Sequence, residues 1–495
     1  MENIIDYLKA ERSQEWRAEV RKRMKAKERT SLQRINMPEE DPDVRNKNSV
    51  EVNKGLAPEM AIAEAHRCLD CADPTCITGC PVGINIPKFI KQIEVEDFAG
   101  AAVTLKETNA LPAVCGRVCP QEKQCELNCF YTQKLDKPPI AIGYLERFAA
   151  DWERNSGKMS VPKTEKHNKI KVGVVGSGPA GLAAAGDLAK YGYDVTVFEA
   201  LHEVGGVLKY GIPEFRLPNE LVDVEIETMR KMGIKFRTDF IVGKTATFDD
   251  LKKEGFQAFF VGSGAGLPRF MNIPGENLNG IFSSNEYLTR INLMHAASDE
   301  YDTPVISGKN VAVIGGGNTA MDSVRTAKRL GADKAMIIYR RSEAEMPARI
   351  EEIKHAKEEG IIFMNLHNPL EYYSDENGRV KQVKLQKMEL GEPDASGRRR
   401  PIPIEGSEFI IDVDTVVVSV GVSPNPLIPK ALKNLKVTDW GTIVVDPDTM
   451  QSSVPEIFAG GDIVRGGATV ILAMGDGRKA AAGMHKYIQE KIQAN

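Results

Sequence analysis

A glycine-rich turn between an apolar strand and an alanine-rich helix constrains the fold of this chain more than any other stretch. The apolar run Val172–Val175 leads into Gly176-x-Gly178-x-x-Gly181. In such a turn the first glycine permits the tight bend, the second lets the backbone approach a pyrophosphate, and the third lets helix and strand pack closely. The next apolar strand ends at Glu199, whose carboxylate can accept hydrogen bonds from a ribose. The stretch therefore predicts a dinucleotide-binding βαβ unit, with the phosphates at the helix N-terminus.

The same pattern occurs again further along the chain, as Gly315-Gly-Gly317-Asn-Thr-Ala320 after a second apolar strand. The strand that follows this second turn ends in Arg340-Arg341, where the first unit has Glu199. An acid at this place bonds a free 2′-hydroxyl and repels a phosphate, whereas an arginine pairs with a 2′-phosphate. We therefore expect FAD in the first unit and NADP(H) in the second. The alternative for the two arginines is an ordinary exposed strand end.

Further candidates for the two dinucleotide sites lie outside the turns. Asp462 stands at the tip of the strand Ile457–Asp462 and can bond the flavin ribityl chain, and the N-terminus of the helix after Ala468 can stabilise negative charge on the flavin. The alternative for Asp462 is a strand-end cap. The FAD candidates are Gly176, Gly178, Pro179, Ala180, Gly181, Glu199, Gly206, Leu208, Gly461, Asp462 and Thr469; the NADP(H) candidates are Gly315, Gly317, Asn318, Thr319, Ala320, Arg340, Arg341 and, more weakly, Arg349.

All eight cysteines lie in one short stretch ahead of the first glycine turn. Disulfides that staple a chain of this size would be spread more widely, and structural zinc usually uses two Cys-x-x-Cys pairs, of which there is one. Two runs of four cysteines, each containing Cys-Pro, are instead typical of [4Fe–4S] clusters. The sequence therefore favours two such clusters, with zinc and disulfides as alternatives. The first run is Cys68, Cys71, Cys76 and Cys80, and the second is Cys115, Cys119, Cys125 and Cys129.

Size and charge narrow the remaining possibilities. The 495 residues suggest about three domains, and the net charge of −4 gives no reason to expect nucleic acid. No apolar run reaches the roughly 18 residues of a membrane span, and the N-terminus lacks the features of a signal peptide, so we expect a cytoplasmic protein. The expected fold class is α/β, with two tandem Rossmann-like dinucleotide-binding domains (FAD and NADP) after an α-helical iron–sulfur domain. The expected ranges are 1–165 for the cluster domain, 166–305 and 416–495 for the FAD domain, and 306–415 for the NADP domain.

Taken together, these motifs resemble the small (beta) subunit of NADPH-dependent glutamate synthase. They are equally similar to the large subunit of the electron-bifurcating NADH-dependent ferredoxin:NADP oxidoreductase, and the N-terminal half of dihydropyrimidine dehydrogenase shares the plan. The segments that carry the resemblance are Leu111–Pro120, Gly176–Leu182, Gly315–Asp322, Gly391–Arg400 and Phe458–Arg465.

The resemblance implies a chain that takes hydride from NADPH onto FAD and passes electrons through the clusters to a partner. That partner would be the glutamate synthase large subunit, in glutamate biosynthesis and ammonia assimilation, or a smaller iron–sulfur flavoprotein subunit. In the full synthase, the part that forms glutamate resembles a glutaminase with an N-terminal cysteine together with an FMN-binding barrel. In this chain residue 2 is Glu and no region long enough for such a barrel remains, so glutamate formation would need the partner. Hydride transfer needs positioning rather than an acid or base, so we expect no catalytic side chain. The alternative is an electron-transfer subunit without its own NADPH turnover.

The spacing of the cysteines leaves their assignment to clusters open. Each run can hold its own cluster, but the Cys-Pro positions suggest that the runs interleave. The resemblance implies one cluster on Cys68, Cys71, Cys76 and Cys129, and a second on Cys80, Cys119, Cys125 and Glu146, with Cys115 spare. The alternative for Glu146 is a solvated acid on a helix.

Overall fold

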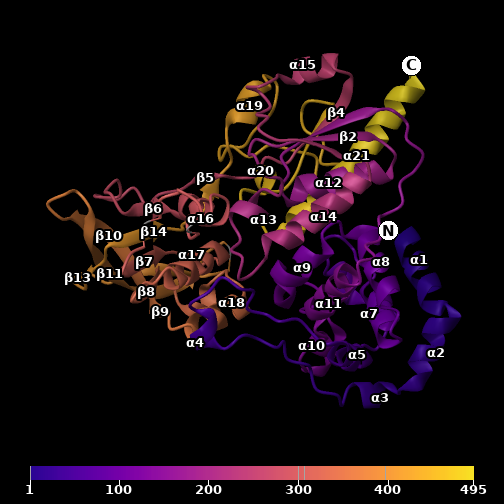
Figure 1. The fold of residues 1–495 in the computed structure, drawn as a ribbon, viewed down its shortest axis with the longest axis horizontal. Coiled ribbons are helices and arrows are strands. Elements are labelled where there is room, and N and C mark those ends of the chain that lie inside the picture. The colour runs from indigo at the N-terminus through magenta and orange to yellow at the C-terminus, as the bar shows by residue number, and fades with distance from the viewer. Residues whose placement is uncertain (1, 299, 306, 396, 495) are drawn as a thin grey trace.

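The computed structural model describes residues 2–298, 300–305, 307–395 and 397–494. It consists of a helical part and two α/β units (Figure 1). The helical part lies below the first α/β unit in this view, and the second unit lies to one side of both. The expected architecture, two tandem α/β units after a helical domain, is confirmed.

The N-terminal part is built from short helices because prolines and cysteine-bearing turns interrupt the chain repeatedly. Four of its helices, α4, α5, α7 and α9, carry proline in the first turn, where its missing N–H has no intrahelical partner to lose. The elements are α1 (Glu2–Ser13), α2 (Glu15–Arg23), α3 (Ala26–Arg29), α4 (Pro42–Arg45), α5 (Pro58–Arg67), α6 (Thr75–Thr78), α7 (Ile86–Glu94), α8 (Phe98–Thr108), α9 (Pro112–Val118), η1 (Gln121–Lys123), α10 (Phe130–Leu135) and α11 (Ile142–Asn155).

Two of these helices, α9 and α11, approach each other unusually closely. A Cβ atom on Gly116 of α9 would lie 2.5 Å from the backbone nitrogen of Arg147 on α11. Glycine is therefore required at this crossing, because any side chain would push the helices apart. The close approach brings the second cysteine run, which begins on α9, against the face of α11 that carries Glu146.

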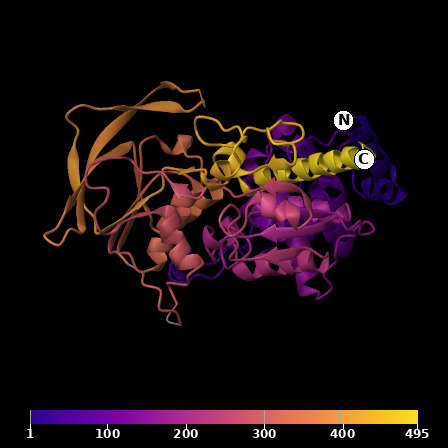
Figure 2. The same ribbon diagram turned by 90° about the horizontal axis from the view of Figure 1, so that it is seen from above.

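The first α/β unit is a five-stranded parallel sheet in the order β16-β4-β1-β2-β3. The edge strand β16 of this sheet comes from the C-terminal part of the chain, after the second unit, so the second unit is inserted into the first. The helices α12 and α21 run side by side on this sheet (Figure 2), and a Cβ on Gly477 of α21 would lie 2.2 Å from the carbonyl oxygen of Ala180 on α12. The elements are β1 (Lys171–Val175), α12 (Pro179–Lys190), β2 (Asp194–Phe198), α13 (Val207–Tyr210), α14 (Asn219–Lys231), β3 (Lys235–Arg237), α15 (Phe248–Lys253), β4 (Phe256–Val261), α19 (Leu427–Ala431), β16 (Ile457–Ala459), α20 (Asp462–Arg465) and α21 (Val470–Ala494).

The second unit is also a parallel sheet, in the order β6-β14-β7-β8-β9, and an antiparallel sheet projects beyond it (Figure 2). The edge strand β6 precedes the boundary expected at residue 305, so that boundary falls inside this unit. The chain passes between the units at two short strands that pair with each other, β5 (Leu267–Pro268) and β15 (Val422–Ser423). The other elements are β6 (Ile281–Ser283), α16 (Ser284–Asn292), β7 (Asn310–Ile314), α17 (Asn318–Arg329), β8 (Lys334–Tyr339), η2 (Glu343–Glu345), α18 (Ile350–Glu358), β9 (Ile362–Asn365), β10 (His367–Ser374), β11 (Val380–Pro393), β12 (Arg399–Pro403), β13 (Phe409–Asp412) and β14 (Thr415–Val418).

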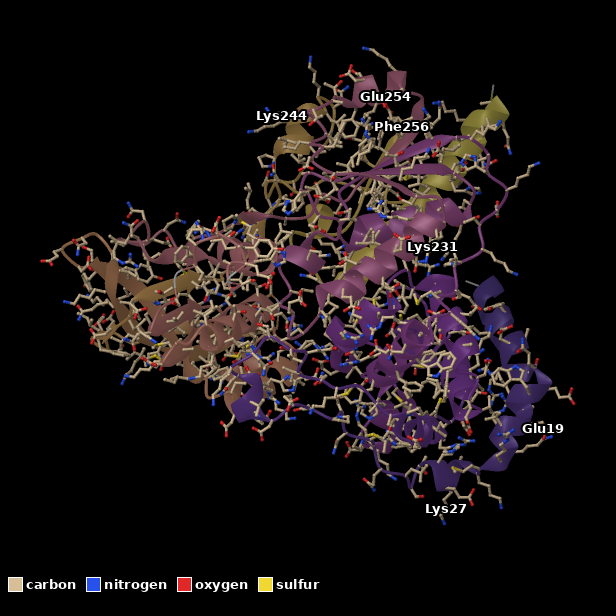
Figure 3. All side chains as sticks on the ribbon, in the orientation of Figure 1. Glu19, Lys27, Lys231, Lys244, Glu254 and Phe256 are labelled. Atoms are coloured by element: carbon tan, nitrogen blue, oxygen red, sulfur yellow. The ribbon has the colours of Figure 1, made fainter. Side chains whose placement is uncertain are left out.

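Charged side chains cover the outside of all three parts. Glu19, Lys27 and Lys244, for example, are exposed, and Figure 3 shows them at the periphery of the ribbon. Among the described helices, none combines the length and the apolar character that crossing a membrane requires.

Candidate cofactor and metal sites

The larger of two dinucleotide-sized cavities, about 1060 Å³, opens at the carboxyl ends of the strands of the first unit. Ligands of doubly wound sheets bind at this edge. Two of the predicted FAD residues do not line it: Leu208 is fully buried, and a Cβ on Gly181 would lie 2.0 Å from the carbonyl oxygen of Gly176, which fits the predicted role in packing. The predicted residues that line it are Gly176, Gly178, Pro179, Ala180, Glu199, Gly206, Gly461, Asp462 and Thr469.

The turn after β1 leaves room for a phosphate group. Gly176 has a φ of +96°, and a Cβ on it would lie 2.6 Å from the carbonyl oxygen of Gly262. No atom lies within 4 Å of the place where a Cβ on Gly178 would stand, so the backbone at the start of α12 is open to the cavity. The Ser263 hydroxyl, which also lines the cavity, is buried without a hydrogen-bond partner among the described residues. These features fit a bound dinucleotide.

The two carboxylates predicted to bind FAD, Glu199 and Asp462, lie at two places in the wall of this cavity. Glu199 at the end of β2 accepts hydrogen bonds from the backbone N–H groups of Ser177 (2.8 Å) and Leu201 (2.9 Å), which fixes its orientation. At the other place, burial raises the pKa of Asp462 above its usual value. Burial also raises the pKa of the cavity residue Tyr210 to about 12, with Asp462 and Glu199 adding to the shift.

Sequence reasoning missed the residue that shapes the turn before Asp462. Asp476 on α21 accepts a hydrogen bond from the Gly461 N–H (3.0 Å) and pairs with Arg465 (2.6 Å). It is 1% exposed and therefore needs these partners. In the sequence Asp476 stands between two glycines of a helix and carries no motif that signals this role.

The second cavity, about 610 Å³, lies at the carboxyl ends of β7 and β8. It shares Phe270, Asn285, Thr319 and Val422 with the first cavity, so the two adjoin each other. Of the predicted NADP(H) residues, those that line it are Gly315, Gly317, Thr319, Arg340 and Arg341. Asn318 faces the first cavity instead, and Ala320 is fully buried in the helix packing.

The structure does not bring Arg349 to this cavity. Its guanidinium group donates to the carbonyl oxygen of Arg117 (2.5 Å) and to the side chain of Gln121 (3.1 Å). Both partners belong to the helical part. Arg349 therefore joins the second unit to the helical part and does not take part in the arginine group at the end of β8.

The arginine group at the end of β8 has a member that sequence reasoning missed. Arg340 is exposed, whereas Arg341 is buried and is held by the carboxylate of Asp394 (2.6 Å) and the carbonyl oxygen of Arg399 (2.8 Å). These contacts fix the β11–β12 hairpin over the cavity, and Arg398 of that hairpin also lines it. With Arg269, four arginines thus line one cavity, which is suited to a phosphate group.

The cysteines surround two small cavities in the helical part, and the two runs interleave. Cys68, Cys71, Cys76 and Cys129 line the first of these cavities; Cys80, Cys119, Cys125 and Glu146 line the second. The runs are joined by a hydrogen bond from the Thr75 hydroxyl to the carbonyl oxygen of Asn128 (2.6 Å). None of the eight cysteines forms a disulfide. Thiolate-rich donor sets of this kind fit iron–sulfur clusters.

Cys115 lines neither cavity. Its sulfur lies 3.5 Å from the Met474 sulfur and 3.6 Å from the side-chain oxygen of Asn109. The same Asn109 donates to Glu146 (2.7 Å), and burial raises the pKa of Glu146 to about 8. The alternative of a solvated helix acid is wrong for Glu146, because the residue is only 5% exposed.

The thiols around the two cysteine cavities are protonated in the absence of a metal. Burial raises the pKa of Cys68 to about 11, that of Cys71 to about 12 and that of Cys80 to about 11. A metal that binds these sulfurs as thiolates must therefore displace protons.

The first two turns of α21 connect the dinucleotide cavity to the cysteines. Val470 and Ala473 line the large cavity, whereas Ile471 lines the second cysteine cavity. The two cysteine cavities in turn share Ile86 and Ile142 as part of their walls. The start of α21 therefore borders both the large cavity and the Glu146 cavity, and the Glu146 cavity shares two wall residues with the Cys68 cavity.

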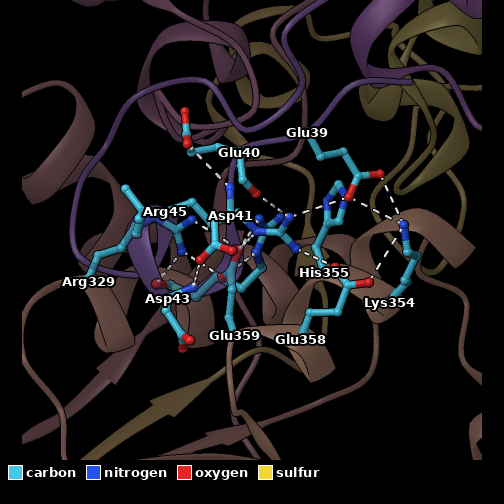
Figure 4. A network of polar contacts seen from close by, with 12 residues as sticks. Glu39, Glu40, Asp41, Asp43, Arg45, Arg329, Lys354, His355, Glu358 and Glu359 are labelled. Carbon is cyan, nitrogen blue, oxygen red and sulfur yellow. Dashed lines mark hydrogen bonds and ion pairs between the residues drawn. The ribbon is translucent and has the colours of Figure 1, made fainter. Parts of the chain in front are cut away.

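A buried network of charges joins the three parts of the chain. Arg216 of the first unit binds Asp322 of α17 (2.7 Å) and Glu352 of α18 (3.0 Å). Arg325 pairs with Glu352 and, at 2.7 Å, with Glu359. Glu359 also binds Arg45 of the N-terminal part (3.1 Å; Figure 4). Burial alone would raise the pKa of Glu359, but Arg325 and Arg329 lower it from a usual value of 4.5 to about 2.

Acid should weaken this network. A carboxylate whose pKa is lowered by folding stabilises the fold fully above its usual pKa, and that stabilisation is lost as the pH falls through the folded value. Between pH 4.5 and 2, protonation of Glu359 should lower the free energy of unfolding by about 3 kcal/mol. Urea unfolding at several pH values checks this, with Glu359→Gln as the matched control. The same pH dependence in both proteins would show that Glu359 is not ion-paired.

Beyond the cysteine cavities, the described residues place Glu39, His355 and Glu358 close enough together to hold a metal ion (Figure 4). Lys354 already lies 3.0 Å from Glu39 and 3.6 Å from Glu358, and Arg45 lies 2.6 Å from Glu358. The two carboxylates are thus already neutralised by cations. The group joins the N-terminal part to α18 and does not favour a metal.

Two family models divide the chain as the structure does. Residues 45–158 match the model described as dihydropyrimidine dehydrogenase domain II, 4Fe-4S cluster. Residues 170–477 match the pyridine nucleotide-disulphide oxidoreductase model. Over 467 residues the chain is 37% identical to the glutamate synthase [NADPH] small chain of Azospirillum brasilense, with 92% of this chain and 95% of that one covered. The chain belongs to the glutamate synthase small-chain family.

Other proteins to which this chain is similar are also redox proteins. The glutamate synthase [NADPH] small chain of Escherichia coli is 36% identical, with 92% of this chain and 98% of that one covered. The NADP(+)-dependent formate dehydrogenase subunit beta of Moorella thermoacetica is 37% identical, with 84% and 60% covered. Mycobacterium tuberculosis FprA in complex with NADPH has the same fold over 66% of this chain and 86% of its own, with a TM-score of 0.55 and 20% identity. The small-chain family member is thus an NADPH-dependent oxidoreductase built as an iron–sulfur flavoprotein.

Proposed function

We propose that this chain takes hydride from NADPH onto FAD and delivers the electrons through two [4Fe–4S] clusters to a partner subunit, as the small subunit of glutamate synthase. The observation that carries the proposal is that the start of α21 borders both the large cavity and the Glu146 cavity, while the two four-donor cavities share Ile86 and Ile142. When bound, FAD supplies a hydride acceptor, and each cluster supplies a one-electron carrier.

The side chains of the large cavity would bind and orient the dinucleotides. The open backbone at Gly178 would receive the FAD pyrophosphate, and Glu199 would accept hydrogen bonds from the adenosine ribose. Because the two cavities adjoin at Thr319, a dinucleotide bound at Arg340 would extend toward the flavin site. The largely apolar lining of the large cavity would exclude water from the flavin. No acid or base is required, so we assign no catalytic side chain.

We assign the cluster ligands by the cavities that they line. Cys68, Cys71, Cys76 and Cys129 would hold the cluster farther from the flavin. Cys80, Cys119, Cys125 and Glu146 would hold the nearer one, and Cys115 would stay a free thiol. A carboxylate ligand should tune the potential of the nearer cluster away from its all-cysteine value.

The partner is proposed from the relatives. The chain covers 95% and 98% of two glutamate synthase small chains but only 60% of the formate dehydrogenase subunit beta. This coverage favours the glutamate synthase large subunit as the partner.

The composition of the purified protein tests the proposal. Protein prepared without oxygen should be brown, should contain one FAD and about eight iron atoms per chain, and should reduce an artificial dye with NADPH. The measurements are flavin extraction, iron analysis and dye reduction on the isolated chain. Stoichiometric zinc without iron would overturn the cluster assignment. Iron and FAD without dye reduction would instead favour an electron-transfer subunit that has no NADPH turnover.

A further inference from the structure

The covalent connections between the two units do not by themselves fix the position of the second unit relative to the large cavity. The chain passes between the two units at the short strands β5 and β15. Yet residues Asn318, Thr319 and Asp322 at the start of α17 form part of the wall of the large cavity. A small rotation about the two strands would move this helix end, so other contacts must hold it.

Arg216 makes one such contact in the wall of the cavity itself. It lines the large cavity from the first unit and binds both carboxylate oxygens of Asp322, at 2.7 and 2.8 Å. Neither side chain is more than 6% exposed. Both bonds come from Nη1 of Arg216, while its Nε lies 3.0 Å from Glu352 of α18. Because the guanidinium group is planar and rigid, holding two carboxylates at once ties the start of α17 and α18 to the first unit.

From Arg216 the charges alternate toward the N-terminal part, through Glu352, Arg325 and Glu359 to Arg45, and none of these side chains is more than 6% exposed. Phe215 lies under the chain of charges, with the guanidinium groups of Arg325 and Arg329 at 4.7 and 3.8 Å from its ring centre. Removing one member would leave a neighbour buried without a counter-charge, so the members hold their positions together.

Arg45 is the last residue of α4, which is part of a loop, residues 38–54, that contacts all three parts of the chain. The loop is closed at its base by hydrogen bonds from the Lys54 N–H to the carbonyl oxygen of Pro38 (2.8 Å) and from the Glu40 N–H to that of Val52 (2.9 Å). It contacts the first unit through a bond from the Val52 N–H to the carbonyl oxygen of Phe215 (3.0 Å). Glu51 in the same loop binds Arg117 of the helical part at 2.8 Å.

We propose that Arg45 and Arg216 are positioning residues for hydride transfer. The buried charges between them fix the start of α17 against the large cavity, and thereby fix where the nicotinamide meets the flavin. This inference rests on the proposed function. It adds that a residue of the N-terminal loop, which lines neither dinucleotide cavity, controls the reaction geometry.

Arg45→Met in the holoenzyme is the first test, because methionine keeps the volume of the side chain and removes its charge. FAD and iron content should remain at wild-type levels. The rate at which saturating NADPH bleaches the flavin absorbance should fall by about tenfold or more, because small misplacements are costly in transfer reactions. Hydrogen exchange should become faster in α17 and α18. Arg45→Lys, which keeps the charge, should recover part of the rate.

Lys106→Met is the matched control, since it breaks the buried pair of Lys106 with Glu153 inside the helical part. It should lower the melting temperature without changing the bleaching rate. If Arg45→Met lowers the melting temperature in the same way and leaves both the rate and the exchange in α17 unchanged, the positioning role is wrong. Should Arg45→Met fail to fold, Glu359→Gln, of nearly the same shape, is judged by the same two measurements. Should the wild type not be bleached by NADPH, the proposed function fails, and hydrogen exchange alone still decides whether the loop controls α17.

Discussion

Replacing Cys115 by alanine should leave about eight iron atoms per chain, whereas replacing Cys119 should remove a large part of one cluster. The two residues are one helical turn apart and both are buried. Only Cys119 lines a cysteine cavity; the Cys115 sulfur contacts Met474 and Asn109. The pair is thus a matched comparison of a ligand with a non-ligand in the same run. Iron analysis and EPR of the reduced protein are the measurements.

Glu146→Ala completes this comparison. It should change the EPR signal of one cluster and leave the other as in the wild type, because Glu146 lines only the second cysteine cavity. Loss of a whole cluster in Cys115→Ala, together with unchanged signals in Glu146→Ala, would mean that each cysteine run holds its own cluster.

Replacing Arg340 by alanine should raise the KM for NADPH by roughly tenfold or more and should hardly affect the KM for NADH. Arg340 is an exposed member of the arginine group that lines the second cavity. Replacing Arg341 as well should increase the loss, since its side chain also holds the β11–β12 hairpin through Asp394. The measurement is steady-state dye reduction with each nucleotide.

The control for this prediction is Arg400→Ala. Arg400 is an exposed arginine of the same hairpin but does not line the cavity, so its removal should change neither KM. Equal losses for NADPH and NADH in Arg340→Ala would show that this side chain does not bind the 2′-phosphate.

Local spacing made the two dinucleotide folds and the cysteine sites predictable from sequence. The glycines of each turn, the acid or arginine at the end of the next strand and the two cysteine runs all lie within short stretches, where residue type follows from backbone geometry. The unit boundary was less accessible. The short strand β6 carries no fingerprint, and only its pairing with the distant strand β14 reveals which sheet it joins.

Contacts between distant segments could not be predicted. Arg216 and Asp322 are 106 residues apart, and nothing in either neighbourhood signals the other. Arg349 is the opposite case: its position shortly after β8 suggested a contact with the phosphate that the structure does not show. Docking of the helical part instead turns its side chain toward Arg117 and Gln121. Where the local sequence allows a residue two roles, the docking of whole domains therefore decides which role it has.

The first turns of α21 make the iron–sulfur domain dependent on a distant part of the chain. Ile471, Met474 and Gly475 follow helical spacing and face the cysteine region; a Cβ on Gly475 would lie 3.0 Å from the carbonyl oxygen of Pro81. A fragment ending near residue 165 would carry every cysteine yet lack one wall of the Glu146 cavity. Transplanting that fragment onto another flavoprotein would therefore require grafting the start of this helix too, since the last segment of the polypeptide completes a site that the first segment begins.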